Sequence, residues 1–317
     1  MSAPALAPLA AAGPPAGVVD GDVRPQAPEP GLLRDLMTLG KPGITIMCLI
    51  MAAGAYALGV EVFAPGVFLA MLAGTGLSVM SANAFNMIIE RDGDRYMART
   101  RSRPLAAGRM GLPVAFAFAG TTGIASVVVL LLWTNPLTAG LAMAAHVLYV
   151  GVYTPAKRRT TQALAIGAVP GAMPPLVGWA AATGSIGAPG LVLFLVLALW
   201  QLPHFLAISI YRRADYEQAG ILVVPAVRGE AAARMQAFVY SFLMVPASLL
   251  LVLIGTAGFL YFVVASVLGA WFLFLSLQGL EPDSDDSWAR KFFLASLVYL
   301  PALTLGLVLD RLFFQGY

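Results

Sequence analysis

The sequence predicts an all-α integral membrane protein with nine transmembrane helices, and three observations carry this prediction. First, 59% of the 317 residues are hydrophobic and only 11% are charged, with a mean hydropathy of +0.82, a composition unlike that of soluble domains. Second, the apolar residues gather into segments of about 20 residues, the length that crosses ~30 Å of hydrocarbon. Third, the basic residues lie almost entirely in alternate connections between these segments.

The chain begins with a stretch whose composition differs from the rest. Residues 1–32 are rich in Ala, Pro and Gly and predict a disordered tail, ahead of a transmembrane domain at 33–317. The tail has a single basic residue, Arg24, so it resembles neither a mitochondrial transit peptide nor a secretory signal. We therefore expect a bacterial inner membrane. An amphipathic segment, Leu32 to Leu39, is expected at the membrane interface.

The apolar segments follow in order. They are predicted at 43–60, 66–89, 113–133, 136–153, 163–183, 190–211, 236–257, 259–278 and 290–312. Several contain Gly and Pro, which membrane helices tolerate because neighbouring groups satisfy the freed backbone atoms. With a cytoplasmic N-terminus, every Lys and Arg except Arg311 falls on the inner side. The positive-inside rule therefore predicts a cytoplasmic N-terminus and a periplasmic C-terminus.

One inner connection concentrates polar chemistry. Asn86, Glu90 and Asp94 are spaced four residues apart, and each step of four over-rotates a helix by roughly 40°, so the three side chains share one stripe. Oxygen ligands of this kind suit Mg²⁺, which takes one or two carboxylates together with substrate phosphate. Six arginines lie between Arg91 and Arg109, and guanidinium groups suit phosphate oxygens. The alternative is a charged loop whose arginines serve only topology.

The other ionisable residues point to the same side of the membrane. Every acidic residue except Glu61 and Asp310 lies in the tail or in the inner connections. A channel or a proton-coupled transporter more often buries such groups near the middle of the bilayer. The basic residues lie in short loops and form no extended basic domain, so nucleic-acid binding is not expected. The sequence therefore predicts a site at the cytoplasmic mouth of the bundle.

A second motif follows the sixth apolar segment. Asp215 and Glu217 form a second acidic cluster on the predicted inner side, and two such clusters facing each other could hold metal ions on one diphosphate. Alternatively, they pair with Arg212 and Arg213 at a helix end. His204 follows Pro203 in an apolar helix and could be a packed residue, a proton carrier or a haem-iron ligand.

A third motif joins aromatic and basic residues. Tyr149 and Tyr153 share a helix face, and Lys157 and Arg158 follow within reach of a diphosphate. Arg159 could serve topology alone, and the other membrane histidine, His146, is expected to be structural. The single cysteine excludes a disulfide framework or a multi-thiolate metal site.

Over residues 33–312 these motifs resemble the UbiA-type intramembrane prenyltransferases. Asn86-x-x-x-Glu90-x-x-x-Asp94 followed by Arg99-Thr-x-x-Arg103-Pro104-Leu105 is similar to the first aspartate-rich motif of that superfamily. The later motifs resemble its protohaem IX farnesyltransferase (haem O synthase) branch. They are Tyr153-Thr154 with Lys157-Arg158-x-Thr160, Gln201-x-Pro203-His204-Phe205, and Asp215-Tyr216-x-x-Ala219-Gly220 leading to Pro225.

The resemblance implies a UbiA-type bundle that transfers a farnesyl group from farnesyl diphosphate to a vinyl group of haem B. Asn86, Glu90, Asp94 and Asp215 would hold Mg²⁺ on the diphosphate, and His204 would act on the haem iron or on a proton. The implied substrate-binding residues are Arg95, Arg99, Arg103, Tyr153, Lys157, Arg158, Gln201 and Tyr216. Haem A synthase or a terminal oxidase subunit would be the expected protein partner, and membrane lipid the surroundings.

Two departures from the superfamily pattern keep an alternative open. Glu90 stands where many members have Asp, which keeps the carboxylate but lengthens its arm. The second acidic cluster is sparser than in members that prenylate quinone precursors. A polyprenyl transfer to an aromatic acceptor such as 4-hydroxybenzoate is the alternative function.

Overall fold

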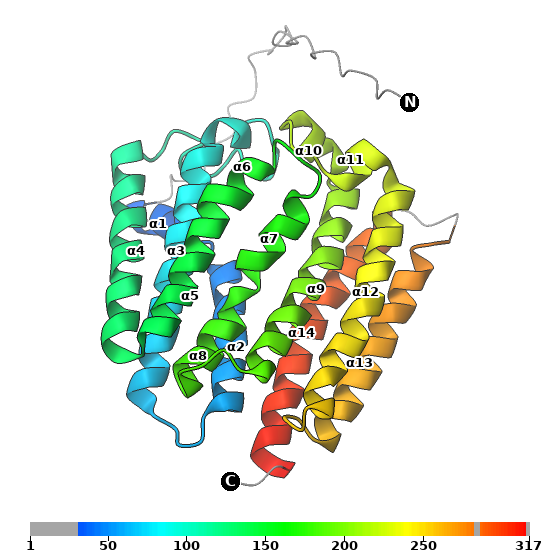
Figure 1. Cartoon of the computed structure of the whole chain (residues 1–317). Helices are drawn as coiled ribbons and strands as arrows, with labels where there is room; N and C mark the ends of the chain where they lie inside the picture. The colour runs from blue at the N-terminus through cyan, green and yellow to red at the C-terminus, as the bar shows by residue number, and fades with distance from the viewer. Residues whose placement is uncertain (1–30, 282–285, 315–317) are drawn as a thin grey trace, which may run out of the picture. The chain divides into compact units, whose positions relative to one another are not determined.

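The computed structural model describes residues 31–281 and 286–314, and in these residues the chain is helical without strands. Figure 1 shows the helices side by side in one bundle. Their bounds are α1 (Leu32–Gly40), α2 (Pro42–Gly59), α3 (Pro65–Asp94), α4 (Leu112–Trp133), α5 (Pro136–Val147), η1 (Leu148–Tyr153), α6 (Thr154–Ala156), α7 (Ala163–Gly171), α8 (Met173–Thr183), α9 (Ala188–Tyr211), α10 (Arg213–Gln218), α11 (Val224–Arg228), α12 (Glu230–Leu253), α13 (Phe259–Gln278) and α14 (Asp286–Phe314).

The predicted all-α membrane fold is confirmed. Nine candidate spans are found within the described residues: α2, α3, α4, the continuous run α5–η1–α6, the pair α7–α8, α9, α12, α13 and α14. The predicted disordered tail at 1–32 falls almost wholly outside the described residues. The amphipathic segment at Leu32–Leu39 is confirmed as α1, whose side chains Leu32, Leu33 and Met37 are exposed.

Helix starts follow simple backbone chemistry. Proline occupies the first or second position of eight of the described helices, among them α2, α3, α5 and α9, because its missing N–H has no partner to lose there. Asn135 caps α5 by accepting a hydrogen bond from the Thr138 amide at 2.9 Å. Asp310 of α14, fully buried, accepts from the amides of Gly258 and Tyr261 at 2.5 and 3.2 Å and so satisfies the start of α13.

Two helices differ from the predicted spans in ways that shape the site. α3 was expected to end near residue 89 and instead runs to Asp94, because Glu90 and Arg91 favour helix and the ion pair of Asp94 with Arg103 fixes the last residue. The fourth span changes from α-helix to π-helix at Leu148–Tyr153. Such π segments are rare and occur often at functional sites. No hydrophobic pattern in the sequence signalled this one.

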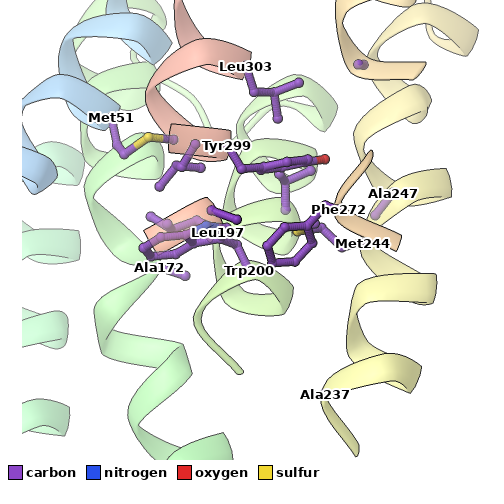
Figure 2. Packing of buried hydrophobic residues seen from close by; sticks show 14 of the residues in the cluster. Met51, Ala172, Leu197, Trp200, Ala237, Met244, Ala247, Phe272, Tyr299 and Leu303 are labelled. Carbon is purple, nitrogen blue, oxygen red and sulfur yellow. The ribbon is translucent and has the colours of Figure 1, made fainter. Parts of the chain in front are cut away.

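The largest core cluster joins α9, α12, α13 and α14. Figure 2 shows Tyr299 beside Phe272 and Leu303 in this cluster, with the Phe272 and Tyr299 ring centroids 5.2 Å apart. The Trp200 indole N–H donates to the Ser296 carbonyl at 2.9 Å. Small buried residues such as Ala207 and Ala237 let the helices approach closely, as packing within lipid requires.

α2 and α8 approach each other closely at Gly178. A Cβ at this position would collide with the Ala52 carbonyl, a backbone group that cannot turn aside. We expect Gly178→Ala to lower the free energy of unfolding by about 1–3 kcal/mol through overpacking. Thermal unfolding in detergent measures this change. Gly120→Ala in α4 is the matched control, because nothing lies within 4 Å of its added Cβ, and an equal loss in both variants would contradict the close approach.

Candidate active site

A cavity of about 220 Å³ opens at the end of the bundle that carries α6, α10 and α11, the upper end in Figure 1. One wall is charged and comes from α3, η1, the loop after α3 and the start of α2. The opposite wall is apolar and includes Leu164, Phe205, Leu206 and Leu222. The polar lining residues are Lys41, Asn86, Glu90, Asp94, Arg99, Thr100, Arg103, Tyr149, Tyr153, Lys157, Thr161, Ser209 and Tyr216.

The stripe predicted from the sequence lies on α3 and faces this cavity. Asn86, Glu90 and Asp94 all belong to the cavity lining and to the same helix. Asn86 and Asp94 are buried, and Glu90 is partly buried. The extension of α3 to Asp94 is what keeps the third member on the stripe, since a helix ending near residue 89 would release it.

A side-chain oxygen of each stripe residue accepts a hydrogen bond from a Lys or Arg side chain. Lys41 Nζ donates to Asn86 Oδ1 at 2.9 Å, and Lys157 Nζ donates to Glu90 Oε1 at 2.7 Å. Arg103 Nη1 donates to Asp94 Oδ2 at 2.7 Å. Charge-assisted hydrogen bonds at these distances are the strong kind, and a carboxylate buried without such a partner would be costly. Each of the three polar side chains of the stripe thus has a Lys or Arg partner within the protein.

Lys41 is a site residue that the sequence reasoning used only for topology. It is the one non-glycine with a positive φ (48°) among the described residues, a strained conformation that clusters at functional sites. Burial, followed by the nearby charges of Arg103 and Lys157, lowers its pKa to about 7. The Gly40-Lys41-Pro42 sequence was the available signal, because a lysine between a helix-ending glycine and a helix-starting proline has a constrained backbone.

Lys157 is held in its charged form. Burial alone would lower its pKa, but the Tyr153 ring and the Glu90 carboxylate outweigh burial and raise the pKa well above the ordinary lysine value. Its Nζ lies 4.6 Å from the centroid of the Tyr153 ring, within the range of a cation–π contact. Lys157 therefore remains a cation across the whole physiological pH range.

The π-helix η1 places two tyrosines at the cavity. The ring centroids of Tyr149 and Tyr153 lie 5.1 Å apart, and Thr154 links this turn to the stripe by accepting from Asn86 Nδ2 at 3.2 Å. A Cβ at Gly167 of α7 would meet the Tyr153 ring at 2.5 Å. The shared face predicted for the tyrosines is confirmed, and the glycine opposite lets Tyr153 pack there.

The arginines after α3 divide into two groups. Arg99 and Arg103 line the cavity. Arg109 instead binds Asp35 of α1 with two hydrogen bonds, at 3.0 and 3.3 Å, and donates to the Ser102 carbonyl at 3.0 Å. Arg95 is exposed and outside the cavity lining. The loop thus combines residues that face the cavity with one that ties it to α1.

Asp215 and Tyr216 are neighbours within α10, but their side chains have different surroundings. Tyr216 lines the cavity, whereas Asp215 lies 3.5 Å from Arg212 and is not part of the lining. Glu217 pairs with Arg213 at 2.9 Å. These contacts match the alternative of ion pairs at a helix end, and within the described residues no three His, Cys, Asp or Glu side chains gather as a metal-binding group. The loop after α10 is tied to the site by the Leu222 amide, which donates to the Lys157 carbonyl at 3.1 Å.

Three further predicted residues lie outside the cavity lining. Gln201 donates to the carbonyls of Ala168 and Leu197 at 3.3 and 3.1 Å and so joins α9 to α7. His204 stacks on Trp200 with centroids 4.7 Å apart, and its Nδ1 lies 2.7 Å from Ser296 Oγ. Arg158 is exposed and lies against Gly93. In this structure Gln201 and His204 are packed, hydrogen-bonded residues behind the apolar wall, and the α9 residues that reach the cavity are Phe205, Leu206, Ile208 and Ser209.

The fold and the site together define a multi-pass membrane protein with a cavity suited to an anion that carries an apolar substituent. Four cations, two carboxylates and three tyrosines face an apolar wall, an arrangement suited to a phosphate ester of a hydrophobic alcohol. Residues 47–297 match the UbiA prenyltransferase family. The chain belongs to this family and is a prenyltransferase.

Curated relatives and solved structures agree with this assignment. The chain is 49% identical to the protoheme IX farnesyltransferase of Sorangium cellulosum over 238 residues, which cover 75% of this chain and 85% of the relative. It is 44% identical to that of Anaeromyxobacter dehalogenans over 287 residues, covering 90% and 97%.

The fold is shared with more distant proteins of known structure. A structure of a digeranylgeranylglyceryl phosphate synthase matches with a TM-score of 0.74 at 17% identity, covering 88% of this chain and 98% of that one. A UbiA homolog from Archaeoglobus fulgidus bound to GPP and Mg²⁺ matches with a TM-score of 0.62 at 14% identity, covering 86% and 99%. At these identities the likeness concerns the helical architecture.

Arg99 provides a test of the cavity assignment. It lines the cavity and has no carboxylate partner among the ion pairs described, so its guanidinium is available to a phosphate. Because a hydrogen bond to a charged group contributes about 1.5–3 kcal/mol, we expect Arg99→Ala to raise the KM for the prenyl diphosphate roughly tenfold or more. Arg101→Ala is the control, since Arg101 is exposed and outside the lining. Equal kinetics for the two variants would contradict the assignment.

Proposed function

We propose that this enzyme transfers the farnesyl group of farnesyl diphosphate to a vinyl group of haem B, with addition of water, to give haem O. The observation that carries the proposal is the identity of 44–49% to proteins named protoheme IX farnesyltransferase, over most of both chains. The cavity supports it, because its charged wall suits a diphosphate and its apolar wall suits a flat hydrophobic acceptor.

The reaction balances as follows. The bond between C1 of the farnesyl group and the diphosphate oxygen breaks, and its electron pair leaves with the diphosphate. The vinyl π electrons form the new bond to C1, which places a positive charge on the carbon next to the macrocycle. Water adds to that carbon and loses a proton. The products are haem O and inorganic diphosphate.

The chain's own cations would stabilise the leaving group. Arg99, Arg103, Lys157 and Lys41 surround the same cavity, and preorganised donors aimed at developing negative charge are the largest contribution in many enzymes. The rings of Tyr153 and Tyr216 also line it and would favour the allylic cation through their π faces. The surrounding helices would keep bulk water from that cation until the acceptor has reacted.

Magnesium is proposed as the metal cofactor. The oxygen-only donors Asn86, Glu90 and Asp94 are the ligand types that Mg²⁺ prefers beside a substrate diphosphate, and a UbiA homolog has been solved with GPP and Mg²⁺. When bound, the ion would neutralise charge on the diphosphate. Lys157 and Arg103 now hold the carboxylates, so both cations would turn toward phosphate oxygens when the ion takes their place. Asp215 is paired with Arg212 and would have to swing inward to contribute.

His204 and Gln201 are proposed to hold in place the apolar wall of the cavity, against which the haem acceptor would lie. His204 touches Phe205 with ring centroids 5.2 Å apart, and Phe205 lines the cavity.

The location proposed for the enzyme is the bacterial inner membrane with the cavity facing the cytoplasm, where haem A synthase or an oxidase subunit would receive the product. Its named relatives are bacterial.

The function is tested with the purified protein in lipid nanodiscs. Farnesyl diphosphate and Mg²⁺ are supplied with either haem B or 4-hydroxybenzoate, and products are separated by chromatography and identified by mass. We expect farnesylated, hydrated haem from the first mixture alone. Prenylated 4-hydroxybenzoate without haem O would replace this proposal by the alternative acceptor.

The metal role is tested at Asp94. We expect Asp94→Ala to reduce transfer by at least 100-fold at every Mg²⁺ concentration, because the carboxylate is lost from the stripe and Arg103 loses its partner. Asp92→Ala on the same helix is the matched control, since the Asp92 side chain is 70% exposed and contacts only Arg91 among the ion pairs described. Thermal unfolding of both variants checks folding. Mg²⁺-dependent turnover at the wild-type rate in a folded Asp94→Ala protein would remove Asp94 from the site.

A further inference from the structure

A second cavity, of about 90 Å³, continues from the first toward the middle of the bundle. Ile44 and Tyr149 line both cavities, so the two share a wall. The second cavity lies among α2, α3, α5, α7 and α8, and its lining is largely apolar, with Val79, Ala82, Ala142 and Val177 among its members. It therefore offers a hydrocarbon chain a path away from the charged wall.

A third hollow lies beyond it, between α3, α4 and α5, with a volume of about 310 Å³. Ser78 and His146 line both the second cavity and this hollow. The third hollow also includes Ile124, Val128 and Met143, which are exposed on the outside of the bundle. Ser78 and His146 thus form a partition between an internal cavity and a surface that faces lipid.

We propose that the second cavity binds the end of the prenyl chain and that the His146 partition, with Ala142 below it, limits the chain to the length of a farnesyl group. This inference rests on the proposed function for the identity of the substrate. It gives His146, which the reaction does not use, a role in selecting chain length.

The depth of the path matches a farnesyl chain. Asn86 marks the diphosphate end and Thr75 the deep end of the second cavity, both on α3, and their separation in the sequence corresponds to about 16 Å of helix. Carbon–carbon bonds of about 1.5 Å project to ~1.25 Å each in an extended chain, so a farnesyl main chain spans roughly 14 Å, a geranyl chain ~9 Å and a geranylgeranyl chain ~19 Å. The longest chain exceeds the path.

The volume gives the same limit. A cavity of about 150 Å³ holds one benzene ring, so the second cavity, at about 90 Å³, takes at most the terminal isoprene unit while the first cavity holds the rest of the chain. An added isoprene unit has no space unless the partition opens. His146 is fixed there by Phe85, whose ring meets it edge-on at 5.7 Å between centroids.

The polar atoms of the path are compatible with this ligand. The Ser78 hydroxyl donates to the Ala142 carbonyl at 3.4 Å, and the Tyr149 hydroxyl lies 3.5 Å from Asn83 Oδ1. The Thr75 hydroxyl, on a side chain 3% exposed, has no hydrogen-bond partner. A double bond of an unsaturated chain offers this O–H a weak π acceptor, which a saturated acyl chain does not.

The test measures binding of unreactive thiolodiphosphate analogues with geranyl, farnesyl and geranylgeranyl chains, using the full protein in nanodiscs with Mg²⁺. The wild type is expected to bind the farnesyl analogue most tightly. His146→Ala opens the partition and should improve the geranylgeranyl analogue at least tenfold relative to farnesyl. Ala142→Leu fills the deep end and should shift the preference at least tenfold toward geranyl.

Met143→Ala is the matched control, because Met143 lines the third hollow and not the second cavity, and its ranking should equal that of the wild type. The two site variants move the preference in opposite directions, so either one decides the question if the other does not fold. An unchanged ranking of the three analogues in a folded variant overturns the proposal. That is the result expected if the second cavity held the acceptor instead of the prenyl chain. The assay needs no haem, so a wrong acceptor assignment leaves its result intact.

Discussion

The site depends on the pairing of three side-chain oxygens with three cations at the edge of an apolar bundle. An unpaired charge there would raise the free energy of the folded state. Lys41, Lys157 and Arg103 come from three separate segments and converge on one stripe of α3. Their convergence explains features that look unrelated. The strained backbone at Lys41, the π-helix before Lys157 and the folded loop that returns Arg103 to Asp94 each bring one cation to its donor. The same pairs keep the site assembled before substrate arrives.

Much of this fold could be predicted from the sequence because lipid imposes simple rules. Long apolar segments must be helices, and the nine predicted segments correspond to the nine candidate spans among the described residues. The spacing of Asn86, Glu90 and Asp94 also translated directly into a shared stripe, since all three lie on one helix. Such local regularities need no knowledge of tertiary contacts. The extension of α3 to Asp94 and the π segment were missed, because polar residues and backbone register are set by packing partners far away in the sequence.

Contacts between segments far apart in the sequence were harder to predict. Asp215 and Tyr216 are neighbours in sequence, yet only Tyr216 lines the cavity, because α10 turns Asp215 toward Arg212. Likewise, Gln201 lies one turn before Phe205 and His204 directly precedes it, but hydrogen bonds to α7 and α14 turn both away from the cavity. A motif shows which residue types occur together. Which of them reaches the cavity depends on one helix rotation, and no periodicity within α9 fixes that rotation.

The Asp35–Arg109 pair has a mechanical consequence. α1 exposes Leu32, Leu33 and Met37 on one side and buries Asp35 on the other, and an amphipathic helix of this kind rests at the boundary between headgroups and acyl chains. Through Arg109, which also holds the Ser102 carbonyl, the loop bearing Arg99 and Arg103 is anchored to that helix. With α1 at the membrane interface, as its amphipathic sequence leads us to expect, a bilayer that thins or thickens would displace α1 and the arginine loop together.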